Sequence, residues 1–297
     1  MRTGAGTAQY PTMKSSCRIR AGLAAASALG ACVLAGSAQA DDLIRAANNQ
    51  QSLTLGLAHV HEGEQARDNA NVVVLNEESG PQLQLGYGST RTRTLFGVPG
   101  FYTDLRLLLG LGTLAYAGPS YAANTGVAGP NGGNFNHASE TVRLRVGRSL
   151  ELGDAGHIAL TPYLGLGQQA WMSSASSQTR ATVYGHYSGE LGLLAQAAVT
   201  HQIVLGVDAS AAREFAAIQV DRQFMTWPHR GTGTSFGLYL DNRTYSDWHQ
   251  RLEIRQDNLH YGEPATVANV FEPRRSSGLA VQLTFGTELD LYKGLFY

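Results

Sequence analysis

The chain has only two cysteines among its 297 residues, Cys17 and Cys32, and both lie in its first forty residues. Beyond that stretch it can form no disulfide, no cysteine-ligated zinc site and no thiol active site. Lysine is almost as scarce there, since Lys293 is the only one. No apolar run of about 20 residues follows residue 40, which excludes a bundle of membrane-spanning helices.

The first forty residues have the features of a secretory signal peptide. Three bases within residues 14–20 precede a small-residue apolar stretch, Ala21–Gly36, and Ala38-Gln39-Ala40 is an A-x-A cleavage site. We therefore expect cleavage after residue 40, with Met13 as the better initiator. A lipoprotein is the alternative, because the residues ending at Cys32 loosely resemble a lipobox, but that choice passes over the better site.

Removing this segment changes the charge balance. It takes away four bases and no acid, which leaves 18 bases and 23 acids, a net charge of −5. This net negative charge provides no positive electrostatic field to attract nucleic acid, so no nucleic-acid partner is expected.

Ten short segments of the remaining chain alternate apolar and polar residues. In the last one, four large apolar residues alternate with Ala280, Gln282 and Thr284. A period of two is typical of a strand with one apolar and one polar face. The ten segments are 53–58, 83–87, 105–111, 142–146, 158–166, 190–199, 203–208, 236–240, 251–255 and 279–285.

The links between the segments alternate between long and short. The long links are expected as loops around 62–77, 118–137, 173–180, 222–230 and 262–277, and the shorter ones at 89–100, 153–156, 200–201 and 244–247. Long outer loops and short periplasmic turns are typical of outer-membrane barrels. The sequence therefore predicts an all-β fold, a transmembrane antiparallel up-and-down β-barrel, formed as one domain by residues 41–297. About ten strands are expected, and eight or twelve stay open.

Aromatic residues near the segment ends suit the interfacial girdles of such a barrel. They are Phe101, Tyr102, Tyr116, Tyr121, Trp171, Tyr184, Tyr187, Tyr245, Trp248 and Phe285. The alternative is a soluble periplasmic sandwich with aromatics scattered at its strand ends.

With its signal segment, stretches such as Pro162–Gly167 and an aromatic-terminated last strand, the mature chain resembles the small bacterial outer-membrane β-barrel proteins. The resemblance implies the outer membrane of a Gram-negative bacterium, contact with outer-membrane lipid and lipopolysaccharide, and recognition by the barrel-assembly machinery. Two endings compete for the last strand. Residues 278–285 alternate regularly, whereas the terminal 289–297 is aromatic but places Lys293 on its lipid face.

If leucine, valine and isoleucine face outward, five acids and five arginines face the lumen. They are Asp104, Arg106, Arg143, Arg145, Glu190, Asp208, Asp241, Arg251, Glu253 and Arg255. Charges cannot stay unpaired in a narrow interior of low dielectric constant. They either cross-link the lumen into a plug or line a narrow wet channel with a transverse field, and the balanced count fits both.

Other candidate chemistry is weaker. His59 and His61 beside Glu62 and Glu64 hint at a metal, but rim histidines are the simpler interpretation, so no metal is expected.

Hydrolase candidates are Ser188, His186, His249, His260 and Asp257, but no nucleophile elbow surrounds them, so no enzyme and no cofactor are expected. The stretch Phe215–Arg230 binds a partner or lipopolysaccharide phosphates, folds inward and constricts the barrel, or packs on neighbouring loops.

The leading functional hypothesis is a narrow channel for small solutes. A closed structural or adhesive barrel acting through its outer loops is the second, and a lipid-modifying outer-membrane enzyme is the third. A homo-oligomer stays open, because leucine-rich faces suit lipid and a second barrel equally.

Overall fold

The computed structural model describes residues 40–68, 71–95, 97–121, 128–152, 157–173, 182–219, 224–226, 231–245, 247–260 and 274–288. Residues 1–39, which hold nearly all of the predicted signal peptide, and the terminal 289–297 lie outside these ranges. Within the described residues, no helix has the length and apolarity needed to cross a membrane.

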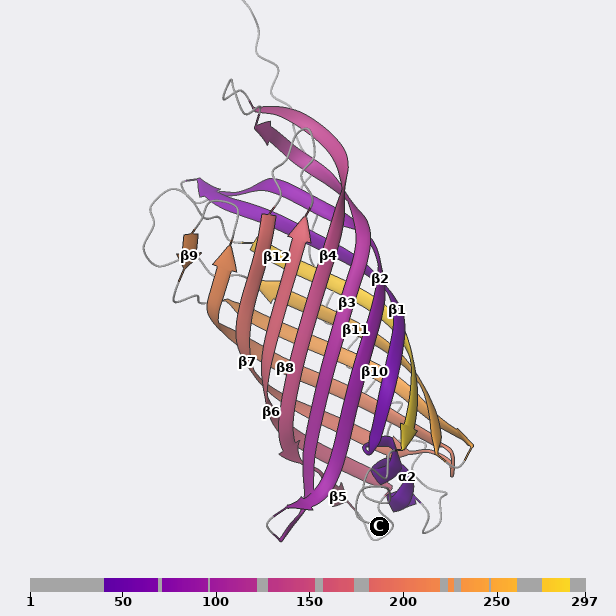
Figure 1. Ribbon diagram of the computed structural model, residues 1–297. Helices are drawn as coiled ribbons and strands as arrows, with labels where there is room; N and C mark the ends of the chain where they lie inside the picture. Colours follow the sequence, from indigo (N-terminus) through magenta and orange to yellow (C-terminus); the bar gives the residue numbers. More distant parts are fainter. Residues whose placement is uncertain are drawn as a thin grey trace, which may run out of the picture. The chain divides into compact units, whose positions relative to one another are not determined.

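Ten long strands form one closed antiparallel sheet (Figure 1). They are β1 (Gln50–Asp68), β2 (Asn71–Leu95), β3 (Val98–Tyr121), β4 (Ala128–Arg148), β6 (Ile158–Ser173), β7 (Thr182–Ala198), β8 (Ile203–Gln219), β10 (Thr232–Tyr245), β11 (Trp248–His260) and β12 (Arg274–Glu288). Each pairs with the next long strand, and β12 pairs with β1 to close the barrel. Two three-residue strands, β5 (Leu150–Leu152) and β9 (Phe224–Thr226), pair with β6 and β8.

This architecture confirms the predicted ten-strand up-and-down barrel. Every alternating segment lies in a long strand of its own, apart from residue 199 at the end of the sixth segment. The segment 278–285 lies within β12, where Phe285 is the partner of Leu53 on β1. The regularly alternating ending is therefore the one that closes the barrel.

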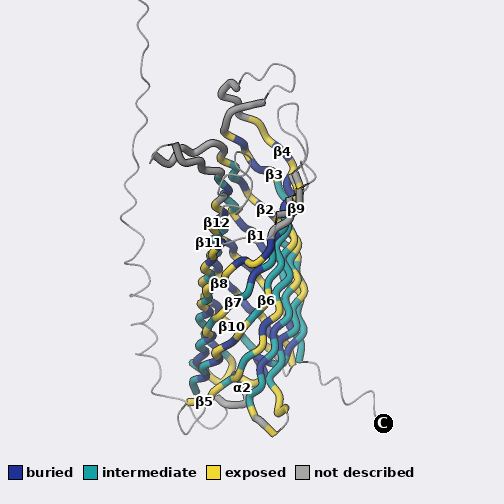
Figure 2. Tube along the Cα trace, turned by 90° about the vertical axis from the view of Figure 1, so that its left-hand side faces the viewer, coloured by how far each residue is buried: buried dark blue, intermediate teal, exposed yellow. Residues whose placement is uncertain are grey.

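Apolar side chains face outward and polar side chains face the lumen. On β11, Leu252 and Ile254 are 49% and 47% exposed, whereas Arg251, Glu253 and Arg255 are at most 7% exposed. Figure 2 shows the same alternation of buried and exposed residues along neighbouring strands. A surface of leucines around a charged interior suits a lipid environment and not water.

Two stretches predicted as long loops, 62–77 and 118–137, are strand in their described residues. β1 and β2 extend to Asp68 and Asn71, and β3 and β4 extend to Tyr121 and Ala128, beyond the neighbouring strands in Figure 1. Backbone groups of a hairpin pair with each other whatever side chains they carry, so polar composition did not reveal the pairing. The stretches 174–181, 220–223, 227–230 and 261–273 lie outside the described residues.

One short helix, α2 (Ala40–Ala47), precedes β1 and was not predicted. Leu43, Ile44 and Ala47 share one of its faces and are buried against Ala159 of β6 and Val204 of β8. The helix lies at the end of the barrel where the short connections are (Figure 2). Two helical turns are too few to show a clear period in the sequence.

The predicted aromatic girdle is wrong for several members. Tyr102, Tyr116, Trp171 and Tyr184 are at most 8% exposed, because they occupy inward positions of their strands. Trp248 and Phe285 do face outward and are exposed. Closeness to a segment end therefore did not predict whether an aromatic ring faces the lumen or the outside of the barrel.

A cluster of three tyrosines and one leucine lies in the lumen near α2. It contains Tyr102, Tyr163, Leu194 and Tyr239, from β3, β6, β7 and β10. The ring of Tyr163 lies over Gly192, and the ring of Tyr239 lies over Gly206. Each glycine leaves the space that a ring occupies, so the layer depends on both.

We expect Gly206→Ala to destabilise the barrel by about 1–3 kcal/mol, because an overpacked site must shift its neighbours. The added Cβ would overlap the Tyr239 ring. Gly189→Ala is the matched control, since a Cβ there meets nothing within 4 Å. Urea unfolding of the refolded protein measures both variants, and equal stability would contradict the glycine–tyrosine packing.

Candidate functional site: the barrel lumen

The ten charged residues expected at the lumen lie inside the barrel, on six of its strands. Eight of them are at most 7% exposed, while the side chains of Arg106 and Arg143 are 26% and 17% exposed. Every one of them has an ion-pair partner within 4.0 Å. The structure therefore places all ten inside the barrel as paired charges, in two clusters.

Asp208 of β8 is the centre of this network. Its carboxylate accepts hydrogen bonds from Arg145 Nη1 at 2.8 Å, from Arg255 Nη2 at 2.7 Å and from the Tyr163 hydroxyl at 2.5 Å. The Arg145 guanidinium also lies 2.6 Å from Glu190 and stacks 4.4 Å from the centroid of the Tyr163 ring. Charge-assisted bonds from three other strands thus meet at one buried carboxylate.

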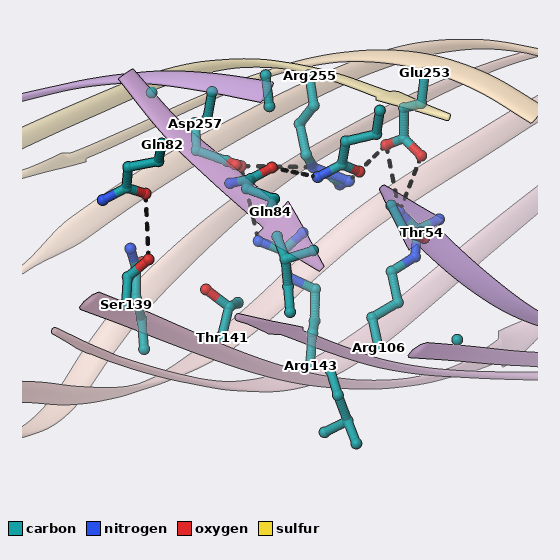
Figure 3. A pocket seen from close by; sticks show the side chains of 18 of the residues that line it. Thr54, Gln82, Gln84, Arg106, Ser139, Thr141, Arg143, Glu253, Arg255 and Asp257 are labelled. Carbon is teal, nitrogen blue, oxygen red and sulfur yellow. Dashed lines mark hydrogen bonds and ion pairs between the residues drawn. The ribbon is translucent and has the colours of Figure 1, made fainter. Parts of the chain in front are cut away.

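Two further ion pairs bridge opposite walls. Arg106 of β3 lies 3.1 Å from Glu253 of β11, and Arg143 of β4 lies 3.7 Å from Asp257 of β11. β4 and β11 are five positions apart around the ring of ten long strands, so the second pair spans the lumen. Figure 3 shows Arg106 and Glu253 reaching toward each other.

A second cluster fastens the end of α2 to the barrel. Asp241 accepts a hydrogen bond from Arg251 Nε at 3.0 Å and lies 2.6 Å from His249 Nδ1. Arg251 also donates from Nη2 to the Ala47 carbonyl, at 3.1 Å, and Gln50 Nε2 donates to the same carbonyl at 2.8 Å. These donors satisfy a carbonyl that the helix end would otherwise leave unpaired.

A reciprocal amide pair adds to this attachment. Asn48 Nδ2 donates to Gln196 Oε1 at 2.7 Å, and Gln196 Nε2 donates to Asn48 Oδ1 at 2.9 Å. Both side chains are at most 2% exposed. No sequence pattern pointed to either residue, because a side-chain amide carries no sign of which distant amide it will meet.

A cavity of about 130 Å³, lined by both polar and apolar side chains, runs along the inside of the barrel, beside the charged network. It extends from Gln50 near α2 to Glu62 and Trp171 near the other end of the barrel. Hydroxyl and amide groups line one part, the network lines another, and apolar side chains such as Leu107, Leu108 and Leu259 complete the lining. The hydroxyl and amide side includes Ser52, Thr54, Gln82, Gln84, Ser139 and Thr141.

The cavity has room for about ten water molecules, at roughly 10–15 Å³ of accessible volume each. Its amides are mutually ordered: Gln282 Nε2 donates to Gln84 Oε1 at 2.9 Å, and the Ser139 hydroxyl donates to Gln82 Oε1 at 3.3 Å (Figure 3 shows the second pair). No sequence pattern pointed to these cavity-lining residues, because serine, threonine and glutamine alternate with leucine in strands of any kind.

The histidines considered for metal binding do not form a site. His59 and His61 lie on the outward face of β1, where His61 Nε2 is 3.2 Å from Glu77 Oε1, whereas Glu62 is buried inside. Among the residues that the structure describes, no three histidine, cysteine, aspartate or glutamate side chains gather as a metal site would require.

The residues considered for hydrolysis are dispersed. His186 and Ser188 are buried on the inner face of β7, where His186 Nδ1 lies 3.9 Å from Glu214. His249 is at the opposite end, beside Asp241, and Asp257 pairs with arginines of the network. Of the stretch 215–230, residues 220–223 and 227–230 lie outside the described ranges.

No protein-family model matches the chain, and no curated protein matches its sequence. Some solved structures are similar to it at low identity. The outer membrane protease OmpT from Escherichia coli is 8% identical, with a TM-score of 0.43 over 82% of this chain and 97% of that one. The translocator domain of the autotransporter NalP from Neisseria meningitidis is 12% identical, with a TM-score of 0.39 over 91% and 98%.

The outer membrane protein OprG from Pseudomonas aeruginosa is 9% identical, with a TM-score of 0.35 over 81% of this chain and 96% of that one. All three TM-scores are below 0.5, so these similarities transfer no fold, no activity and no residue role to this chain.

We expect Asp208→Asn to cost about 3–5 kcal/mol of stability, because it leaves two buried arginines without their shared countercharge. Asp257→Asn is the control, since the Asp257 side chain is 39% exposed and its arginine contacts are 3.7 Å long. Urea unfolding of the refolded barrel compares them. Similar losses for the two variants would show that the network does not depend on Asp208.

Proposed function

We propose that the protein is an outer-membrane β-barrel with a narrow passage for small polar solutes, closed at the periplasmic end by α2. The lengthwise cavity, with hydroxyl, amide and paired charged groups in its lining, carries this proposal. The apolar outer face and the expected signal peptide support the location, because a closed barrel satisfies its backbone hydrogen bonds within the membrane. The proposal assigns no catalytic step and no cofactor.

The lining supports a solute that is small, polar and without net charge. Hydroxyl and amide groups offer donors and acceptors on one side, and the charges of the other side are paired among themselves. A free ion would gain no net field from balanced walls and would compete with pairs already formed. A neutral or zwitterionic solute can exchange hydrogen bonds with the lining without breaking those pairs.

Closure at the α2 end depends on contacts that can be released. The helix buries three apolar side chains against β6 and β8, and its end is held by Arg251, Gln50 and the Asn48–Gln196 pair. It contains only eight residues. A short helix held in this way is able to leave the lumen while the barrel stays intact.

A closed structural barrel acting through its outer loops is the second candidate. The bridging pairs Arg106–Glu253 and Arg143–Asp257 favour it, because they hold opposite walls together across the lumen. The two candidates differ in whether displacing α2 is enough to let solutes through.

We expect the double variant Leu43→Asp, Ile44→Asp to increase single-channel conductance in a planar bilayer, because charged side chains cannot stay buried against Ala159 and Val204. Arg45→Gln, on the exposed side of the same helix, is the control and should conduct as the unchanged protein does. A folded double variant that stays silent would favour the closed barrel.

We also expect the mature protein to fractionate with the outer membrane and to migrate differently on gels before and after heating. A closed barrel resists unfolding by detergent until its hydrogen-bonded ring is opened by heat. Release with the periplasmic fraction would contradict the proposed location, whatever the conductance result.

A further inference from the structure

A groove of about 600 Å³ lies on the outer face of the barrel, over β4, β6, β7 and β8. Leu144, Leu164, Leu166 and Leu191 form its sides, and each has an exposed side chain. Its floor includes Gly189, where an added Cβ would meet nothing within 4 Å. The groove is therefore an apolar slot open to whatever surrounds the barrel.

Arg213 lies at one end of this groove and distinguishes it from the rest of the apolar face. It is an exposed, outward-facing residue of β8, two positions beyond the groove residue Ala211. In the described part of the chain, its side chain has no hydrogen bond and no ion pair. An arginine placed among leucines on a lipid-facing surface needs a counter-anion or water.

Its height on the barrel matches the outer headgroup region. β8 begins at Ile203, next to a short connection, and Arg213 follows ten residues later. On a strand tilted by about 40°, ten residues rise roughly 25 Å, which is the height of the apolar band of such barrels. The next outward residue, Phe215, lies with its ring centroid 6.5 Å from that of Tyr187, as an interfacial aromatic pair would.

From this placement we propose that the groove binds lipid A of the outer leaflet, with one phosphate on Arg213 and one acyl chain in the slot. The guanidinium offers two parallel donors, which match the geometry of a phosphate. The inference rests on the outer-membrane location proposed above but not on the passage through the lumen.

A second copy of the chain is the competing occupant. A two-fold interface centred on this groove would place the same patch of both copies face to face. The two Arg213 side chains would then approach each other without a countercharge, which disfavours that contact. An anionic lipid supplies the missing charge and the apolar chain together.

The test measures binding of bisphosphorylated lipid A to the refolded barrel in neutral detergent by native mass spectrometry. We expect Arg213→Gln to weaken binding about tenfold, as loss of one charge-assisted contact would. Arg213→Lys should retain most of the affinity. Arg148→Gln is the control. Arg148 is also an exposed, outward-facing arginine, but it is the last residue of β4 and lies at the end of the barrel where the short connections are.

Several results would overturn the proposal. These are unchanged binding by Arg213→Gln, equal weakening by Arg148→Gln, equal binding of lipid A stripped of its phosphates, or equal competition by phosphatidylglycerol. Two chains bound to each other in place of lipid would also do so. Each variant is first checked for heat-modifiable mobility, so loss of binding by a folded barrel counts against this site and not against the outer-membrane location.

Discussion

Closure of β12 on β1 is the constraint from which the rest of the structure follows. A strand edge exposed to lipid would leave its backbone groups without partners, and the fifteen-residue pairing of these two strands removes that edge. Closure also fixes which face of each strand looks inward. Leucines then meet the surroundings, while arginines and carboxylates converge on the lumen, where they have to neutralise one another.

The interior is organised in layers as a result. The α2 helix and the Asp241 cluster lie at one end, followed by the tyrosines packed on glycines and then by the network around Asp208. Arg145 and Arg251 each stack on a tyrosine and pair with an aspartate, so the same combination occurs twice. Large rings and guanidinium groups fill one side, and small hydroxyl residues on the other leave the polar cavity.

The inner and outer faces of the barrel wall differ in how their charges are paired. Inside, charges are paired and the open space is lined by neutral polar groups, which suits passage or hydration more than tight binding of an ion. Outside, Arg213 lies unpaired among the described residues at the level of an aromatic pair. Arg213 therefore needs a counter-anion from the surroundings, whereas the inner arginines are already paired with carboxylates of the lumen.

The sequence by itself indicated the strand segments, a number of about ten and the outward face, because a period of two is a local property and closure forces the apolar half toward lipid. The exact number came from the closed sheet. It also indicated which charges turn inward. It did not determine that Arg143 meets Asp257, that Asn48 meets Gln196, or that Trp171 and Tyr102 lie inside. Those contacts join strands far apart along the chain, so only the register and curvature of the closed barrel decided them. Helix α2 depended on tertiary structure for the same reason, since its short apolar face is stabilised by β6 and β8 and not by its own turns.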